Sequence, residues 1–152
     1  MPSLKRRRLR AVLDTNVWVS AMIWGGLPAN IIKAAEDGRI SIVASEEIVR
    51  EINQTLGYPR LRNIYEGVGI GREELIEAVL RVAKMVEVKE KISLIQEDPA
   101  DNKFLECALH GRADYIVSGD SHLLGVGQYQ GIQILSVRQF PKLIEGSLGA
   151  SP

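Results

Sequence analysis

The sequence predicts an α/β domain in which helices cover both faces of a central parallel sheet. Short apolar runs, such as LRAVL at Leu9–Leu13, alternate along the chain with longer segments of helical periodicity. Strands of a parallel sheet are buried on both faces and therefore read as nearly continuous apolar runs. A length of 152 residues with 45% apolar side chains suits one domain with a substantial core. Together these observations favour an α/β sandwich.

Four apolar runs are predicted strands, and a fifth short strand is expected near residues 85–88. The four are Leu9–Leu13, Ile40–Ala44, 114–118 and Ile132–Leu135. Helices are predicted from the end of the first strand to Ile23 and over 28–37, 46–56, 60–66, 72–84, 101–110 and 137–144. Gly38 and Gly111 mark two helix ends, and Ser45 is a predicted N-cap. The sequence contains no internal repeat or interdomain linker.

Charge is unevenly distributed, although the 19 basic and 19 acidic residues balance overall. Five basic residues and no acid fall within the first ten positions, which leaves 14 basic and 19 acidic residues elsewhere. We expect a mobile basic tip over 1–8, a single domain over 9–145 and a frayed tail over 146–152. An acidic body favours bound cations over a broad nucleic-acid platform. The tip is either a phosphate-contacting segment or a solvated tail.

Cys107 is the only cysteine, so an internal disulfide is excluded. The reducing cytoplasm is the natural compartment for such a chain. Asp14 and Asn16 interrupt the apolar run that follows the basic residues, and no long uncharged apolar stretch occurs elsewhere. We expect neither a signal peptide nor a membrane span.

Three aspartates are expected at one edge of the sheet. Asp14 follows the first strand, Asp120 follows the strand YIVSG, and Asp101 lies at the start of a helix that should begin on the same edge. Ligands of open parallel sheets bind outside the carboxyl ends of the strands, near the point where strand order reverses. Each acid alone is also explained as a helix N-cap. Their joint position is what suggests a site.

Carboxylates that converge on one cleft repel one another and raise their own pKa values unless a cation neutralises them. Oxygen ligands favour the hard cations Mg²⁺ and Mn²⁺. Zinc is disfavoured because the sequence has no cluster of cysteine and histidine. The helix SEEIVREINQTL offers a fourth acid, and helical periodicity places Glu46 and Glu51 at opposite edges of its apolar stripe without choosing between them.

The helix that begins DPADNKFLECAL carries an acid on its apolar side. Asp101 precedes Phe104 by three positions and Leu105 by four, so it starts the stripe that should face the core. Asp98 is a predicted N-cap, Pro99 fills the first helical position and Asp101 occupies N3. Asp101 is therefore either a capping residue or part of a cleft.

Four motifs together resemble the PIN domain, and most of all its VapC-type toxin ribonucleases. They are DTNVWVSAMI, SEEIVREI, DPADNKFLECAL and ADYIVSGDSHLL, in the order that the family has. The resemblance extends from about Leu9 to residue 143. It implies a three-layer α/β/α fold around a parallel sheet and a single-stranded RNA nuclease site in which acids coordinate Mg²⁺ or Mn²⁺.

Matched position by position, the family acids correspond to Asp14, Glu51, Asp101 and Asp120. The choice of Glu51 over Glu46 comes from the resemblance and not from periodicity. The polar residues that orient the acids correspond to Asn16 and Ser118. Many relatives carry a further acid where this chain has His122, which we interpret as a structural or solvated residue and which weakens the case for a tightly bound second metal.

The resemblance also implies partners and a reaction. Metal-dependent hydrolysis of RNA would leave a 5′-phosphate and a 3′-hydroxyl, and one or two metal ions can serve such chemistry. A toxin would bind a small antitoxin that inserts a peptide over the acidic cleft. Family members commonly form homodimers, and Trp18 or Trp24 is either a core residue, part of a dimer face or a base-stacking residue.

Two other functions compete with the ribonuclease. A haloacid-dehalogenase-like phosphatase also places an aspartate after its first strand, but it needs a second acid two residues later, where this chain has Asn16. A degenerate PIN fold that acts as a binding module is the second alternative. The presence of all four acids argues against it without demonstrating turnover.

Overall fold

The structure is a computed structural model that describes residues 8–92, 94 and 99–149. Most of the expected basic tip, and the expected N-cap Asp98, lie outside the described residues. Arg10 is described and has a structural role, because its guanidinium donates to the backbone carbonyl of Gly111 at 3.1 Å. Among the described residues, no helix is long and apolar enough to cross a membrane.

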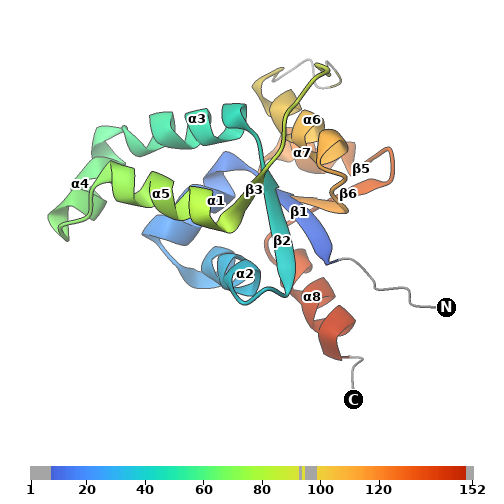
Figure 1. Ribbon diagram of the computed structural model, residues 1–152, viewed down its shortest axis with the longest axis horizontal. Helices are drawn as coiled ribbons and strands as arrows, with labels where there is room; N and C mark the ends of the chain where they lie inside the picture. Colours follow the sequence, from blue (N-terminus) through green and yellow to red (C-terminus); the bar gives the residue numbers. More distant parts are fainter. Residues whose placement is uncertain (1–7, 93, 95–98, 150–152) are drawn as a thin grey trace.

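The fold is a six-stranded sheet in the order β3-β2-β1-β4-β6-β5, with helices on both faces (Figure 1). The strands are β1 (Leu9–Leu13), β2 (Ile40–Ala44), β3 (Ala83–Met85), β4 (Tyr115–Val117), β5 (Gln128–Tyr129) and β6 (Ile132–Leu135). All neighbouring strands are parallel except the edge pair β5–β6, which is antiparallel. The predicted α/β sandwich with a mostly parallel sheet is confirmed.

The helices that precede β4 are α1 (Thr15–Ile23), α2 (Gly26–Glu36), α3 (Glu46–Leu56), α4 (Pro59–Gly67), α5 (Arg72–Val82), a 3₁₀ turn η1 (Pro99–Asp101) and α6 (Asn102–His110). Those after β4 are α7 (Ser121–Val126) and α8 (Gln139–Gly149). Figure 1 shows α1 to α5 on one side of the sheet and α6 and α7 on the other. Among the residues whose burial the structure describes, thirty hydrophobic residues from both layers and the sheet form the buried core.

Strand order reverses direction at β1, because β2 lies on one side of it and β4 on the other. The chain builds outward through β2 and β3, then returns through α6 to β4. The carboxyl ends of β1 and β4 are therefore neighbours at a topological switch point, which is where open α/β sheets bind ligands. The backbone of Asp14 joins the two strands there, donating to the carbonyl of Val117 at 3.0 Å.

The boundary between α5 and β3 differs from the prediction. The helix ends at Val82 rather than at residue 84, and the strand begins at Ala83 rather than near residue 85. Pairing of Ala83 with Ile42 of β2 draws these residues into extended backbone, although their apolar pattern continues the helical stripe. Tertiary strand pairing outweighs local helical periodicity at this boundary.

Three further differences occur after β4. The helix α7 and the edge strand β5 are not among the expected elements, because a six-residue helix and a two-residue strand are too short to show periodicity. The turn before β6 places Gln130 and Gly131 at positive φ. The helix α8 extends to Gly149, beyond the expected end at residue 144, and Pro141 lies in its first turn, where proline is tolerated.

Candidate metal site at the switch point of the sheet

Asp14 is both the N-cap of α1 and a buried acid at the end of β1. Its Oδ1 accepts a hydrogen bond from the backbone N–H of Val17 at 2.8 Å, which satisfies a free amide of the first helical turn. Only 3% of the residue is exposed. Asp14 can therefore be both a helix N-cap and a site residue, because its second carboxylate oxygen remains for other partners.

That second oxygen of Asp14 is held by the segment that follows β4. Oδ2 accepts from the Ser118 hydroxyl at 2.5 Å and from the Gly119 N–H at 3.2 Å. The Ser118 oxygen in turn accepts from the N–H of Asp120 at 2.9 Å. Burial raises the pKa of the Asp14 carboxyl, with these hydrogen bonds opposing the rise and the Asp120 charge adding to it. Ser118 thus links the side chain of Asp14 with the backbone of Asp120.

Asp120 caps α7 and lies against Asp101. Its Oδ1 accepts from the N–H groups of His122 at 2.8 Å and Leu123 at 3.2 Å. Burial tends to raise the pKa of Asp120, but hydrogen bonding with Asp101 and with the α7 amides lowers it overall. A hydrogen bond between two carboxyl groups requires a proton on one of them, and a cation can replace that proton.

Asp101 lies where η1 meets α6, with 8% of its surface exposed. The predicted N3 position is wrong, because the chain forms a 3₁₀ turn first and α6 begins at Asn102. The Asp101 side chain makes no capping hydrogen bond to α6. It points instead into a group of three residues, since ligand atoms of Asp101, Asp120 and His122 all lie within 4.8 Å of one another.

His122 is the unexpected member of this group. Its Nδ1 lies 3.6 Å from Oδ1 of Asp120, so the imidazole faces the acids. The His122 side chain is 43% exposed, so its interpretation as a structural or solvated residue stays a prediction beside this contact with the acids. The sequence held a weak signal, because His122 occupies the position where the resembling family often has an acid.

Glu51 reaches the same cleft from the middle of α3. Its Oε1 accepts from the hydroxyl of Thr15, and its Oε2 lies 2.9 Å from Nζ of Lys103. Glu46, the alternative that periodicity left open, is exposed and pairs with Arg50 at 2.7 Å. The structure places Glu51 in the cleft and Glu46 outside it.

The acids line one cavity of about 300 Å³, called here the acidic cleft. Its lining residues are Asp14, Thr15, Asn16, Glu51, Gln54, Thr55, Tyr58, Ala100, Asp101, Phe104 and Asp120. All four predicted acids and Asn16 are among them, while Ser118 lies behind Asp14 and contacts it from the core. Sequence reasoning missed Thr15 and Lys103, whose only signal is that each lies within two residues of a motif acid, Asp14 and Asp101 respectively.

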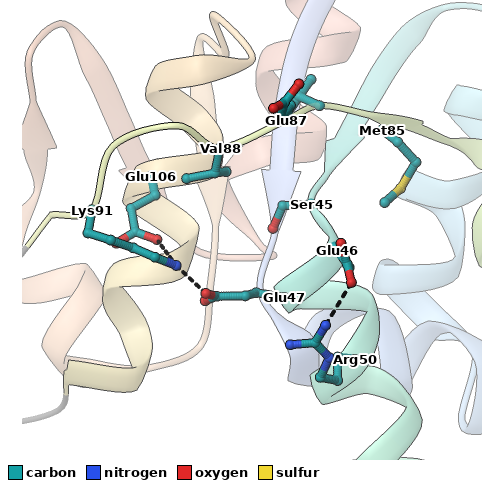
Figure 2. Close-up of a pocket in the computed structure, with 10 residues that line it drawn as sticks. Ser45, Glu46, Glu47, Arg50, Met85, Glu87, Val88, Lys91 and Glu106 are labelled. Carbon is teal, nitrogen blue, oxygen red and sulfur yellow. Dashed lines mark hydrogen bonds and ion pairs between the residues drawn. The ribbon is translucent and has the colours of Figure 1, made fainter.

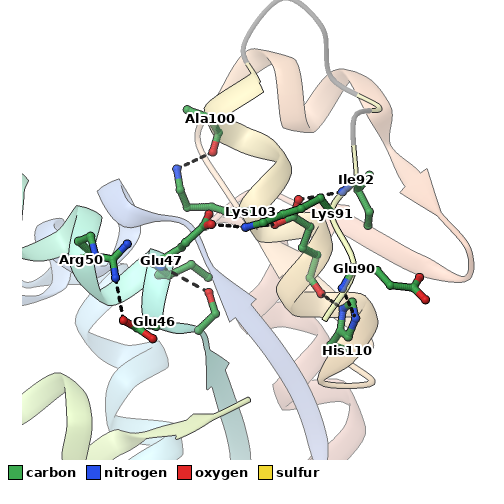
Figure 3. A network of polar contacts seen from close by, with 12 residues as sticks. Glu46, Glu47, Arg50, Glu90, Lys91, Ile92, Ala100, Lys103 and His110 are labelled. Atoms are coloured by element: carbon green, nitrogen blue, oxygen red, sulfur yellow. Dashed lines mark hydrogen bonds and ion pairs between the residues drawn. The ribbon is translucent and has the colours of Figure 1, made fainter. Parts of the chain in front are cut away.

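A larger cavity of about 510 Å³ lies near the N-terminus of α3 and is called here the β3-side cavity (Figure 2). Its residues are Ser45, Glu46, Glu47, Arg50, Met85, Val86, Glu87, Val88, Lys91 and Glu106. Figure 3 shows that basic partners reach its acids: Arg50 contacts Glu46 and Lys91 contacts Glu47. The buried Glu106 accepts from the N–H of Ile92 at 2.8 Å.

The remaining candidate groups do not line the acidic cleft. Trp18 is buried in the core, whereas Trp24 is 63% exposed. Cys107 is buried, and burial raises the pKa of its thiol to about 12, which makes it a poor nucleophile. His110 contacts the carbonyl of Glu106 in the last turn of its own helix.

The fold and the acidic cleft define an α/β protein with a candidate metal site at the switch point of a mostly parallel sheet. Residues 10–122 match the sequence profile of the PIN domain, and this chain therefore belongs to the PIN domain family. The protein MJ1680 of Methanocaldococcus jannaschii is 28% identical over 130 residues, which cover 83% of this chain and 80% of that protein.

Two solved structures share the fold. PAE2754 from Pyrobaculum aerophilum has a TM-score of 0.60 at 12% identity, covering 95% of this chain and 99% of that one. VapBC2 from Rickettsia felis, crystallised with a DNA fragment from its promoter, has a TM-score of 0.58 at 12% identity. That match covers 84% of this chain and 98% of the other. At such identity the likeness concerns the fold alone.

Proposed function

We propose that this protein is a ribonuclease that needs Mg²⁺ or Mn²⁺ and hydrolyses phosphodiester bonds of single-stranded RNA. The observation that supports it most strongly is the convergence of Asp14, Glu51, Asp101 and Asp120 on one cleft at the switch point of the sheet. PIN domain membership adds weight, because nuclease chemistry is the usual activity of that fold.

The donor set of the acidic cleft fits a divalent cation. Asp101 and Asp120 present carboxylate oxygens close enough to ligate one ion, and Asp14 lies behind them on the Ser118 bridge. Oxygen donors suit Mg²⁺ and Mn²⁺, and the imidazole of His122 adds a nitrogen that Mn²⁺ accepts more readily. We propose Asp14, Asp101 and Asp120 as ligands and Glu51 as a ligand or a water-positioning group.

Each side chain has a defined task in this proposal. A bound divalent ion would activate water for in-line attack and neutralise charge on the phosphate. Ser118 fixes the orientation of Asp14, and the α7 amides fix Asp120, so both acids are held in place before substrate arrives. Addition of water across the P–O3′ bond leaves a 5′-phosphate and a 3′-hydroxyl.

We further propose a toxin–antitoxin setting in the cytoplasm. A small antitoxin would place a peptide, with an arginine directed at the acids, over the acidic cleft. A homodimer is also proposed, and the exposed Trp24 and Leu27 at the α1–α2 junction are apolar surface suited to such a contact. Size measurement in solution, with Trp24→Ser as the variant, tests the dimer.

The function is tested by cleavage of a panel of labelled single-stranded RNAs with Mg²⁺, Mn²⁺ or EDTA. We expect metal-dependent cutting by the wild type and loss of cutting in Asp14→Asn and Asp101→Asn. Glu46→Gln is the matched control, because it removes an acid of α3 that lies outside the acidic cleft. Equal cutting by all four proteins would identify a contaminant. No cutting, together with no metal-induced rise in melting temperature, would favour the binding module.

A further inference from the structure

Lys103 is a basic side chain that contacts Glu51, one of the acids of the acidic cleft. It extends from the first turn of α6, and its Nζ lies 2.9 Å from Oε2 of Glu51 and 2.5 Å from the carbonyl of Ala100. The ammonium also lies over the ring of Phe104, at 5.3 Å from its centre. Figure 3 shows Lys103 reaching Ala100 at the rim of the helix. Three separate groups therefore hold this charge in place.

The Lys103–Glu51 pair is shielded from solvent. The Lys103 side chain is 11% exposed and that of Glu51 is 31% exposed. The second lysine–glutamate pair that α3 makes, between Lys91 and Glu47, is 68% and 42% exposed. Water screens the exposed pair strongly, whereas a shielded pair keeps more of its attraction and is costly to break on one side only.

Both oxygens of Glu51 are already engaged. Thr15 donates its hydroxyl to Oε1 while Lys103 binds Oε2. Among the described residues, the group whose ligand atoms lie within 4.8 Å of one another consists of Asp101, Asp120 and His122, and Glu51 does not belong to it. A divalent ion placed in that group therefore does not need Glu51.

We propose that Lys103 serves as a fixed second cation of the acidic cleft, so that the protein binds one divalent ion and not two. The inference rests on the proposed function, because it assumes that the group of Asp101, Asp120 and His122 binds a metal. Lys103 neutralises Glu51 and keeps it from binding the metal, so that of the two roles proposed above for Glu51 water positioning is retained. Loss of the ammonium would leave Glu51 uncompensated in the cleft that Asp14 also lines and would open a second metal position. Lys103 is thus a positioning residue that determines metal stoichiometry.

The test measures how many Mn²⁺ ions each chain binds, by calorimetry and by electron paramagnetic resonance of free Mn²⁺. We expect one ion for the wild type and two for Lys103→Met. Lys103→Gln, which keeps a donor for the Ala100 carbonyl, should also bind two and covers the case in which the methionine variant does not fold. Lys91→Met is the matched control and should bind one, because its partner Glu47 lies outside the acidic cleft.

The double variant Lys103→Met with Glu51→Gln should bind one ion, because it lacks the Glu51 carboxylate that would bind the second ion. One ion in both the wild type and the folded Lys103 variants would overturn the role of Lys103 while leaving the metal site intact. Two ions in the wild type would overturn it as well. Absence of Mn²⁺ binding in every protein would instead overturn the proposed function, and with it this inference.

Discussion

Helix α3 contributes acids to two cavities. The two cavities differ in which groups lie against their carboxylates. The β3-side cavity is larger, at about 510 Å³ against about 300 Å³, and it also contains several glutamates. Three of its acids, Glu46, Glu47 and Glu106, meet an arginine, a lysine and a backbone N–H group respectively. In the acidic cleft, burial raises the pKa of Asp14, and Asp120 lies against Asp101. Cavity size and the number of acids therefore do not distinguish the candidate metal site, whereas the contact between Asp101 and Asp120 at the switch point does.

The largest expected effect is on RNA cleavage, which should depend on the acids of the acidic cleft and not on those of the β3-side cavity. Asp120→Asn should lower metal-dependent RNA cleavage by about 100-fold or more, because it removes the charge of a proposed metal ligand. Glu47→Gln, in the β3-side cavity, should change the rate by less than about twofold, because its pair is exposed and screened. Initial rates at saturating Mn²⁺ provide the measurement. Equal losses in both variants would remove the distinction between the cavities.

Two buried serines provide a smaller and sharper comparison. Ser118→Ala removes the hydroxyl that links Asp14 with the Asp120 amide and should weaken Mn²⁺ affinity by about 10-fold. Ser45→Ala removes the N-cap of α3 and should cost about 1 kcal/mol of folding stability with no change in metal affinity. Calorimetric titration and urea unfolding of both variants test this. Reduced metal affinity in Ser45→Ala alone would contradict the assignment.

The smallest effects concern pH, and they have opposite signs for Asp14 of the acidic cleft and Glu47 of the β3-side cavity. Burial raises the pKa of Asp14 above its ordinary 3.8, so its contribution to stability is present below that pH and is lost as pH rises through the folded pKa. The hydrogen bond from Lys91 lowers the pKa of Glu47 below 4.5, so its contribution is present above that pH and is lost as pH falls through the folded pKa.

Each sign can be measured by comparing the folding stability of the wild type with that of a variant in which the carboxylate is replaced by an amide. In EDTA, the stability of the wild type minus that of Asp14→Asn should decrease with rising pH. The corresponding difference from Glu47→Gln should increase. Urea unfolding at steps from about pH 3 to pH 8 gives both curves. Slopes of the same sign would show that Asp14 and Glu47 change the folding stability in the same direction with pH, and would contradict this prediction.

The parts of the fold that sequence predicts well are those with a strong local signal. The strands β1, β2 and β6 and the caps Ser45 and Gly111 follow from apolar runs and cap chemistry, and they occur as expected. The β5–β6 hairpin and the start of β3 were missed, because pairing with a distant strand defines them. A boundary that depends on tertiary pairing has no sequence period to reveal it.

In the candidate site, too, residues with a local sequence signal were predicted and residues placed by the tertiary fold were missed. Asp14 and Asp120 were expected because both follow buried strands, and the family resemblance selected Glu51 where helical periodicity could not. His122 and Lys103 were not expected as site neighbours. The place of His122 depends on the turn into α7, and that of Lys103 on α6 packing beside α3. A single sequence does not show which residues that are distant along the chain come into contact in the fold.

The most direct test of the account is to locate the ion itself. Crystals soaked in Mn²⁺ and measured with anomalous scattering reveal each bound ion as a separate peak. The account predicts a peak between Asp101, Asp120 and His122 in the acidic cleft and none in the β3-side cavity. A peak beside Glu47 and Glu106, or an empty acidic cleft at saturating Mn²⁺, would contradict it.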